Sequence, residues 1–340
     1  MSDRPGILPD EAIAALARSG AIACADPLEP GQVQPASLDL RLGAKAWRLR
    51  ASFLPGPERA VADRLSGDLV MHEVDLDAGA VLETGCVYLA PLQEGMRLPG
   101  DVAAAMNPKS STGRLDVFTR VIADRAAAFD QAPAGYEGPL YVEICPRTFS
   151  VLARTGDRLV QARMRRGAPK PGRTLTLSVD LSAREGAPVG WRAKRHSPLV
   201  DLARVGGHDA ARFWEPVYAE EGRIVLDPDE FYILASREAV EIPLAEAAEM
   251  APIAPEIGEF RAHYAGFFDP GFGVSEAGGT GAKAVLEVRG RDVPFILDHG
   301  QAVAKLVYEP MAGAVGAPYG ASGSNYQGQS LKLAKHFRPA

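Results

Sequence analysis

The chain has 340 residues, of which 46% are hydrophobic and 24% are charged, and its formal net charge is -6. This length allows two domains of ordinary size, and the composition is typical of a soluble globular protein. The negative charge argues against nucleic acid as a partner, so a phosphate site must use locally placed cations. No apolar run approaches the ~20 residues of a membrane span. The three cysteines have neither zinc-site nor disulfide spacing. We therefore expect a cytoplasmic protein without a membrane partner.

The predicted elements are one short helix followed by many short strands. Asp10 can cap a helix whose apolar residues share one face, and Gly20 can end it. Strands are expected at 34–43, 81–89, 140–144 and 159–164. In these stretches apolar and polar residues alternate, or a short apolar run lies between turn residues. Because Gly and Pro recur throughout, the sequence favours an all-β barrel or sandwich with a short N-terminal helix.

The stretch at residues 107–115, NPKSSTGRL, has the composition of an anion-binding turn. Pro108 and Gly113 restrict the backbone so that N–H groups are exposed, three hydroxyls add donors, and Lys109 and Arg114 supply positive charge. A phosphate chain is the natural ligand, while a polar hairpin turn is the competing interpretation. The stretch is not a Walker loop, because G-x-x-x-x-G-K-S/T is absent.

The second half of the sequence repeats the first at a constant offset. Identical residues lie 144 positions apart, for example 287 − 143 = 144, at Tyr88 and Tyr232, Pro99 and Pro243, Met106 and Met250, Pro108 and Pro252, Glu143 and Glu287, and Gly156 and Gly300. One register held over many turns predicts two copies of one β fold. We place the first domain at residues 1–168, a linker at 169–190 and the second domain at 191–340.

The two copies differ where a site would be built. Residues 253–258 of the second copy replace 109–114 and carry no phosphate-binding chemistry. Conversely, the second copy has a compact hairpin at 265–273, where the first copy has the looser stretch 123–136.

Together these stretches resemble motifs of the dCTP deaminase family, relatives of the trimeric dUTPases. Residues 33–42 resemble the early strand of the family, and residues 109–114 resemble its phosphate and water motif. Residues 265–272 resemble the base-binding hairpin, and residues 284–287 the catalytic strand. Residues 318–320 with 324–329 resemble the mobile C-terminal lid. The resemblance implies two tandem dUTPase-like distorted β-barrels in a homo-oligomer. It also implies a composite site, in which the Ser/Arg motif of the first copy faces the hairpin, glutamate and lid of the second copy, from the same chain or another.

The resemblance implies hydrolytic deamination of dCTP to dUTP and ammonia. Most nucleobase deaminases activate water with zinc through H-x-E and P-C-x-x-C, and the sequence contains neither motif. A zinc-independent mechanism needs a carboxylate as general base, and we expect Glu287 to be that base and the returning acid. By resemblance, Ser110 and the backbone carbonyl of Ala265 position the water, and Arg114 orients the glutamate or stabilises developing charge.

The same resemblance assigns the nucleotide-binding residues. They are Lys109, Ser111, Asp269, Phe272, Val285, Tyr319, Tyr326 and Gln329. One Mg²⁺ is expected to be bound through the triphosphate and water, without a metal site made by the protein. Asn325 stands where many relatives have Lys, which removes one phosphate-binding cation.

Three alternatives remain open from the sequence. Glu143 occupies the place of Glu287 in the first copy and competes for the role of base. A dUTP pyrophosphatase, or a bifunctional enzyme that also hydrolyses dUTP, is the second alternative, because the Asp269 carboxylate could bind the 3′-hydroxyl and activate water for phosphoryl attack. A non-catalytic nucleotide-binding regulator is the third.

Overall fold

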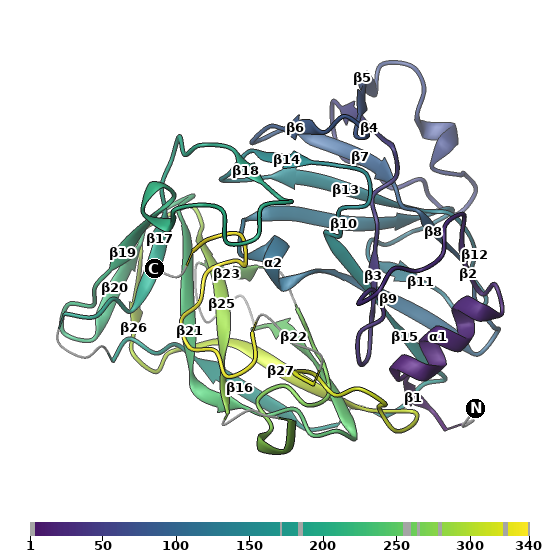
Figure 1. Cartoon of the computed structure of the whole chain (residues 1–340). Coiled ribbons are helices and arrows are strands. Elements are labelled where there is room, and N and C mark those ends of the chain that lie inside the picture. Colours follow the sequence, from purple (N-terminus) through teal and green to yellow (C-terminus); the bar gives the residue numbers. More distant parts are fainter. Residues whose placement is uncertain are drawn as a thin grey trace.

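The computed structural model describes residues 4–170, 172–182, 186–253, 260–263, 266–277, 281–321 and 326–338. These residues form the predicted all-β fold with a short N-terminal helix, α1 (Asp10–Arg18), to which the structure adds one helical turn, α2 (Ser110–Gly113). Figure 1 shows the first-half strands in purple to teal and the second-half strands in green to yellow as two groups that meet near α2. None of the described helices is long and apolar enough to cross a membrane.

Two larger and two smaller sheets form the first half. Their orders are β1-β15-β9-β11 with β3 beside β15, β10-β13-β7-β4-β5, β12-β8-β2 and β18-β14-β6. The strands are β1 (Gly6–Ile7), β2 (Ile22–Cys24), β3 (Leu38–Leu40), β4 (Lys45–Leu49), β5 (Val70–Asp75), β6 (Ala80–Leu82), β7 (Val87–Pro91), β8 (Glu94–Arg97), β9 (Val102–Pro108), β10 (Val117–Ala123), β11 (Gln131–Ala132), β12 (Glu137–Gly138), β13 (Leu140–Pro146), β14 (Val151–Ala153) and β15 (Val160–Arg166).

The second half has the same arrangement of its larger sheets. Their orders are β16-β27-β22-β24 and β19-β17-β21-β25-β23, and β20 pairs with β26. The strands are β16 (Thr174–Ser178), β17 (Gly190–Ala193), β18 (Val200–Asp201), β19 (Trp214–Val217), β20 (Arg223–Leu226), β21 (Phe231–Val240), β22 (Glu246–Pro252), β23 (Phe260–His263), β24 (Phe267–Phe268), β25 (Ala282–Gly290), β26 (Phe295–Asp298) and β27 (Ala302–Pro310).

Several predicted boundaries were wrong for local reasons. The expected strand at 81–89 is split into β6 and β7, because Cys86 N donates to Glu83 O in a turn with Gly85 at φ 76°. The expected strand at 34–43 is only β3, since Gln34 N donates to Ser37 O in a turn before it. Asp10 is the first helical residue rather than the cap.

The Asp10 carboxylate has a different partner from the one predicted. It accepts hydrogen bonds from the backbone N–H groups of Gly316 at 2.9 Å and Ala317 at 2.8 Å, in the second half of the chain. Residues expected to form the linker also join the second half, because β16 pairs with β27. The domain boundaries themselves stay a prediction.

The sheet that carries Glu143 is buried on both faces by the first half itself. Side chains alternate along a strand, so Val142 and Ile144 point into the main core while Glu143 points to the outer face. Residues 50–69 fold over this outer face. Their apolar side chains pack with those of the sheet in a separate cluster that includes Leu49, Phe53, Val61, Leu89 and Ile122.

The equivalent sheet of the second half packs against the first half instead. Ile233 lies opposite Glu287 in the register, and its side chain belongs to the core cluster of the first half, as does that of Val285. The loop at 194–213, which is 144 positions beyond 50–69, reaches across the junction and supplies β18 to the edge of β14. Arg154 Nη1 donates to Asp201 Oδ1 at 2.5 Å there. Residues 50–69 therefore cover a sheet of their own half, whereas residues 194–213 extend to the other half.

The C-terminal segment at 326–338 is anchored in the core. Phe337 is only 6% exposed and makes edge-to-face contacts with Phe149, Phe213 and Trp214, at centroid distances of 6.3, 5.2 and 5.9 Å. Leu333 is also buried. The segment that follows the expected lid is thus a fixed part of the fold.

Replacing Phe337 with Ala should lower the free energy of unfolding by roughly 3–5 kcal/mol, because the cavity left in the aromatic cluster cannot fully collapse. Urea denaturation followed by Trp214 fluorescence measures this change. The exposed neighbour Arg338 is the matched control, and its replacement by Ala should change the free energy by less than about 0.5 kcal/mol. Equal stability of the Phe337 variant and the parent would show that the cluster does not anchor the tail.

Candidate active site

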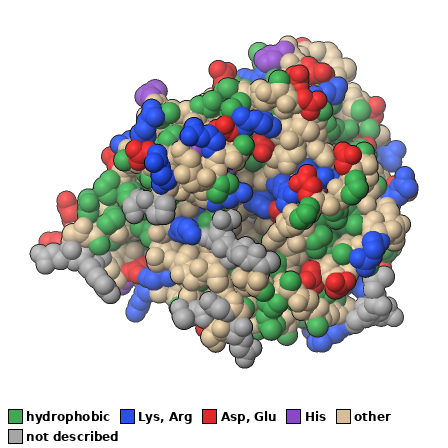
Figure 2. Space-filling model, in the orientation of Figure 1, with side chains coloured by type: hydrophobic (Ala, Val, Ile, Leu, Met, Phe, Trp, Pro, Cys, Tyr) green, Lys and Arg blue, Asp and Glu red, His purple; other side chains and the backbone are tan. Residues whose placement is uncertain are grey.

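A cavity of about 470 Å³ lies where the two halves meet. Its first-half wall consists mainly of α2 and neighbouring loops, and its second-half wall of β24, β25, the turn at 318–320 and the C-terminal segment. Figure 2 shows a hollow near the centre of this face, with Lys and Arg side chains beside it. The cavity therefore combines residues of both halves of one chain.

The predicted anion-binding stretch is a helical turn rather than a hairpin turn. β9 ends at Pro108, Lys109 is extended, and the N–H groups of Thr112 and Gly113 donate to Lys109 O at 2.8 and 3.0 Å. The Thr112 hydroxyl donates to Leu159 O at 2.8 Å, which fixes the turn to the residue that precedes β15. Both serines of the turn line the cavity.

Arg114 joins this turn to the second half. Its Nη1 donates to Lys332 O at 3.0 Å and its Nη2 to Gln329 Oε1 at 2.9 Å. The guanidinium lies 4.0 Å from the centre of the Tyr326 ring. Its Nε is 3.9 Å from Glu287 Oε1, the distance of a loose ion pair. Arg114 is therefore held rigidly beside the carboxylate that it was predicted to orient.

Glu287 is a buried carboxyl group whose protonation is strongly altered. It lies on β25 and is 6% exposed. Burial raises the pKa of Glu287 to about 8, because the charged form loses its hydration, while the nearby Arg114 charge acts in the opposite direction. A carboxyl group that titrates near neutral pH can both accept and return a proton, as a general acid–base catalyst must.

Asp269, on the second-half hairpin, is held by a first-half arginine. Asp269 Oδ1 accepts from Arg163 Nη2 at 2.9 Å, and both side chains are buried. Arg163 also donates to Ala248 O at 2.8 Å and Phe268 O at 3.2 Å. The pKa of Asp269 is raised, because the effect of burial exceeds the opposing effect of the Arg163 charge. The hairpin is thus fixed to the first half by one arginine.

Aromatic rings shape the other side of the hairpin. Phe272 packs edge-to-face on Phe268 at 5.2 Å, and its ring lies 5.6 Å from that of Tyr319. Gly271 has φ +96°, and a Cβ there would lie 2.9 Å from Pro318 Cβ. Only glycine therefore lets the 318–320 turn approach so closely.

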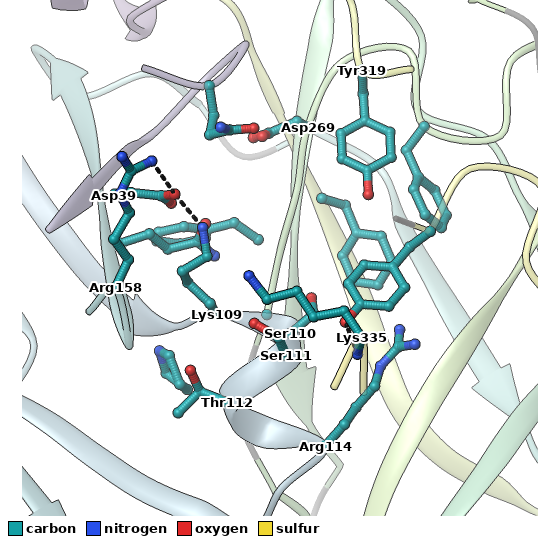
Figure 3. A pocket seen from close by; sticks show the side chains of 18 of the residues that line it. Asp39, Lys109, Ser110, Ser111, Thr112, Arg114, Arg158, Asp269, Tyr319 and Lys335 are labelled. Atoms are coloured by element: carbon teal, nitrogen blue, oxygen red, sulfur yellow. Dashed lines mark hydrogen bonds and ion pairs between the residues drawn. The ribbon is translucent and has the colours of Figure 1, made fainter. Parts of the chain in front are cut away.

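Cations gather at the opposite end of the cavity. The Lys109 ammonium donates to the Asp39 carboxylate, and Arg158 Nη1 lies 3.8 Å from the same carboxylate (Figure 3). Lys335 also lines the cavity. No role was predicted for Asp39, Arg158 or Lys335. Asp39 lies within the predicted strand at 34–43, and no motif distinguishes Arg158 or Lys335 from an ordinary charged residue.

The cavity brings together every described residue that was predicted for the site. These residues are Lys109, Ser110, Ser111, Arg114, Asp269, Phe272, Val285, Glu287, Tyr319, Tyr326 and Gln329. Ala265 and Asn325 lie outside the described residues. Glu143 is not among the residues that line the cavity, and its Oε1 accepts from Arg120 Nη2 at 3.0 Å.

Two family models match successive parts of the chain. The 2′-deoxycytidine 5′-triphosphate deaminase (DCD) N-terminal domain matches residues 4–168, and the C-terminal domain of the same family matches residues 152–337. Two curated relatives are named "dCTP deaminase, dUMP-forming". The protein from Methanoculleus marisnigri is 34% identical over 123 residues, and that from Beutenbergia cavernae is 37% identical over 118 residues. These matches cover 35% and 33% of this chain, and only 59% and 57% of the relatives.

One solved structure is similar over nearly its whole length. It is described as the crystal structure of 2′-deoxycytidine 5′-triphosphate deaminase from Agrobacterium tumefaciens. That protein is 53% identical to this chain, the TM-score is 0.86, and the match covers 91% of this chain and 99% of the other. Together with the family models, this similarity confirms the resemblance found in the sequence. The chain belongs to the 2′-deoxycytidine 5′-triphosphate deaminase family.

Proposed function

We propose that this chain is an enzyme that hydrolyses dCTP to dUTP and ammonia. The observation that carries the proposal is the buried carboxyl group of Glu287, 3.9 Å from Arg114 in a cavity that is also lined by hydroxyls and by lysine and arginine side chains. The names of the curated relatives and of the similar solved structure support the same substrate.

The reaction can be balanced with Glu287 alone as the proton carrier. The Glu287 carboxylate takes a proton from water as the water oxygen bonds to C4 of the cytosine ring, and the proton passes to N3. The carboxylate then takes the proton of the new C4 hydroxyl and gives it to the amino group. The C4–N bond breaks, C4=O forms, ammonia leaves and the carboxylate is regenerated. The Ser110 hydroxyl would hydrogen-bond to the water, and the Ala265 carbonyl would accept a hydrogen bond from it, so that the water is positioned for attack.

Glu287 is a better choice than Glu143 because of what covers each side chain. Residues 50–69 close the outer sheet face around Glu143 with chain from the same half, whereas the corresponding face around Glu287 opens into the cavity. Glu143 pairs with Arg120, whereas Glu287 lies beside Arg114 of the turn that also carries Ser110. A nucleobase therefore has room beside Glu287.

Metal ions are expected only as part of the substrate. No group of three His, Cys, Asp or Glu side chains that could hold a metal occurs in the part of the chain that the structure describes. We propose that Mg²⁺ enters bound to the triphosphate, which Lys109 and Ser111 contact with the help of Arg158. Independence from zinc rests on the missing H-x-E and P-C-x-x-C motifs.

We also infer that the enzyme works in the cytoplasm as a homo-oligomer.

We further infer that the two halves arose by internal duplication. Equivalent contacts support this inference: Glu83 N donates to Tyr88 Oη at 3.1 Å, and Asp227 N donates to Tyr232 Oη at 3.0 Å. The same offset of 144 also relates Trp47 to Trp191 (191 − 47 = 144), and both lie in corresponding strands.

Replacing Glu287 with Gln should reduce ammonia release from dCTP by roughly 10²- to 10⁴-fold, because the amide cannot carry the proton. The matched control is Glu143→Gln, which should keep the rate of the parent to within about threefold if the protein stays folded. Ammonia is measured by a coupled assay. Equal rates for the Glu287 variant and the parent would refute the mechanism, and tight dCTP binding without turnover in the parent would favour the regulator.

The pH dependence of kcat/KM should follow the free-enzyme pKa of Glu287. With a pKa of about 8, the reactive carboxylate increases tenfold per pH unit below that value and is fully formed above it. We therefore expect kcat/KM for dCTP to rise about tenfold per pH unit up to about pH 7 and to level off near pH 9. A profile that is flat over this range would mean that another group carries the proton.

Hydrolysis of dUTP to dUMP is the second candidate activity, favoured by the dUMP-forming names of the curated relatives. Asp269 would serve it by holding the 3′-hydroxyl and a water molecule. Chromatography of products from dCTP distinguishes the activities: dUTP and ammonia indicate deamination alone, while dUMP and pyrophosphate indicate both steps. Because Arg163 already holds Asp269 Oδ1, we expect dUTP as the main product.

A further inference from the structure

Lys335 brings a cation into the cavity from the anchored C-terminal segment. It lines the cavity together with Lys109 and Arg158. Figure 3 shows its side chain extending past Ser110 and Ser111 into the space in front of Lys109. No sequence motif selects this lysine, because it lies beyond the lid motif at 324–329.

Lys335 differs from Lys109 and Arg158 in its pairing with carboxylates. Lys109 is hydrogen-bonded to the Asp39 carboxylate, and Arg158 forms an ion pair with Glu29. Within the described ranges Lys335 forms no ion pair, and burial and the Lys109 charge lower its pKa. The more distant Asp39 and Asp157 carboxylates act in the opposite direction but do not outweigh these effects. A partly buried ammonium without a directly paired carboxylate is costly, and this cost is relieved when an anion binds.

The backbone around Lys335 is fixed before any ligand arrives. Its N–H donates to the hydroxyl of Tyr326 at 3.2 Å, and its C=O accepts from Gly206 N at 2.9 Å. Phe337, two residues later, sits in the aromatic cluster. A cation on a preorganised segment loses little entropy on binding, so its contribution to affinity is larger.

We propose that Lys335 binds the phosphate chain of the nucleotide and supplies the positive charge that Lys109 and Arg158 share with carboxylates. The inference rests on the proposed function for the identity of the nucleotide, but the charge argument applies to any polyphosphate. Because the Tyr326 ring lies on Arg114 and its hydroxyl accepts from Lys335, the same segment contacts both the phosphate end and the catalytic end of the cavity.

Calorimetric titration of the full chain with inorganic tripolyphosphate tests this proposal without requiring turnover. Lys335→Met should bind tripolyphosphate about 10- to 100-fold more weakly, because one hydrogen bond to a charged group is lost. Lys335→Arg keeps the charge and should bind within about threefold of the parent. Arg338→Met removes one positive charge from an exposed position three residues away and should have no effect.

Three outcomes would overturn the proposal: equal affinity of Lys335→Met and the parent, an equal loss in Lys335→Arg, or no tripolyphosphate binding by the folded parent. Melting temperatures of all variants confirm folding. With dCTP, the Met variant should show a raised KM and a kcat within about threefold. If the parent binds tripolyphosphate but releases no ammonia from dCTP, the deaminase proposal fails while the role of Lys335 stands.

Discussion

The contact between the outer face of the β25 sheet and the first half determines the rest of the structure. Ile233 and Val285, on that face, are buried in the core of the first half, so the face cannot be exposed without losing apolar burial. The cavity exists because the contact is incomplete around Glu287. In the first half, residues 50–69 cover the corresponding face with apolar side chains. One fold thus has two different surroundings in a single chain.

Burial at this contact also determines the electrostatics. Arg163, Asp269, Arg114 and Glu287 all lose most of their hydration between the halves. Arg163 and Asp269 compensate each other directly, and their ion pair holds the hairpin in place. Arg114 and Glu287 are farther apart and compensate each other less, so burial dominates the pKa of the glutamate. A tight pair suits a structural support, and a loose pair suits a group that must exchange protons.

The C-terminal segment has two physical roles that are usually separate. Its end is part of an aromatic cluster and stabilises the junction, while Tyr326 and Gln329 contact Arg114 inside the cavity. An element that is anchored at its end and polar along its length can hold charged groups in a fixed geometry. This explains how a cavity between the two halves has rigid walls.

The sequence by itself determined the fold class and the family, because turn residues, strand periodicity and short motifs are local features. The residues that it predicted for a site also line one cavity, as far as the structure describes them. Strand ends were less predictable, as the turn at Glu83 shows, since local hydrogen bonds override periodicity. Only the tertiary structure decided that the two halves of one chain share the cavity, that residues 50–69 cover Glu143 whereas Glu287 faces the cavity, and that Asp39, Arg158 and Lys335 line it. These facts depend on how the loops at 50–69 and 194–213 pack at the contact between the two halves. Such packing joins residues that are distant in the sequence, so it has no local signature there.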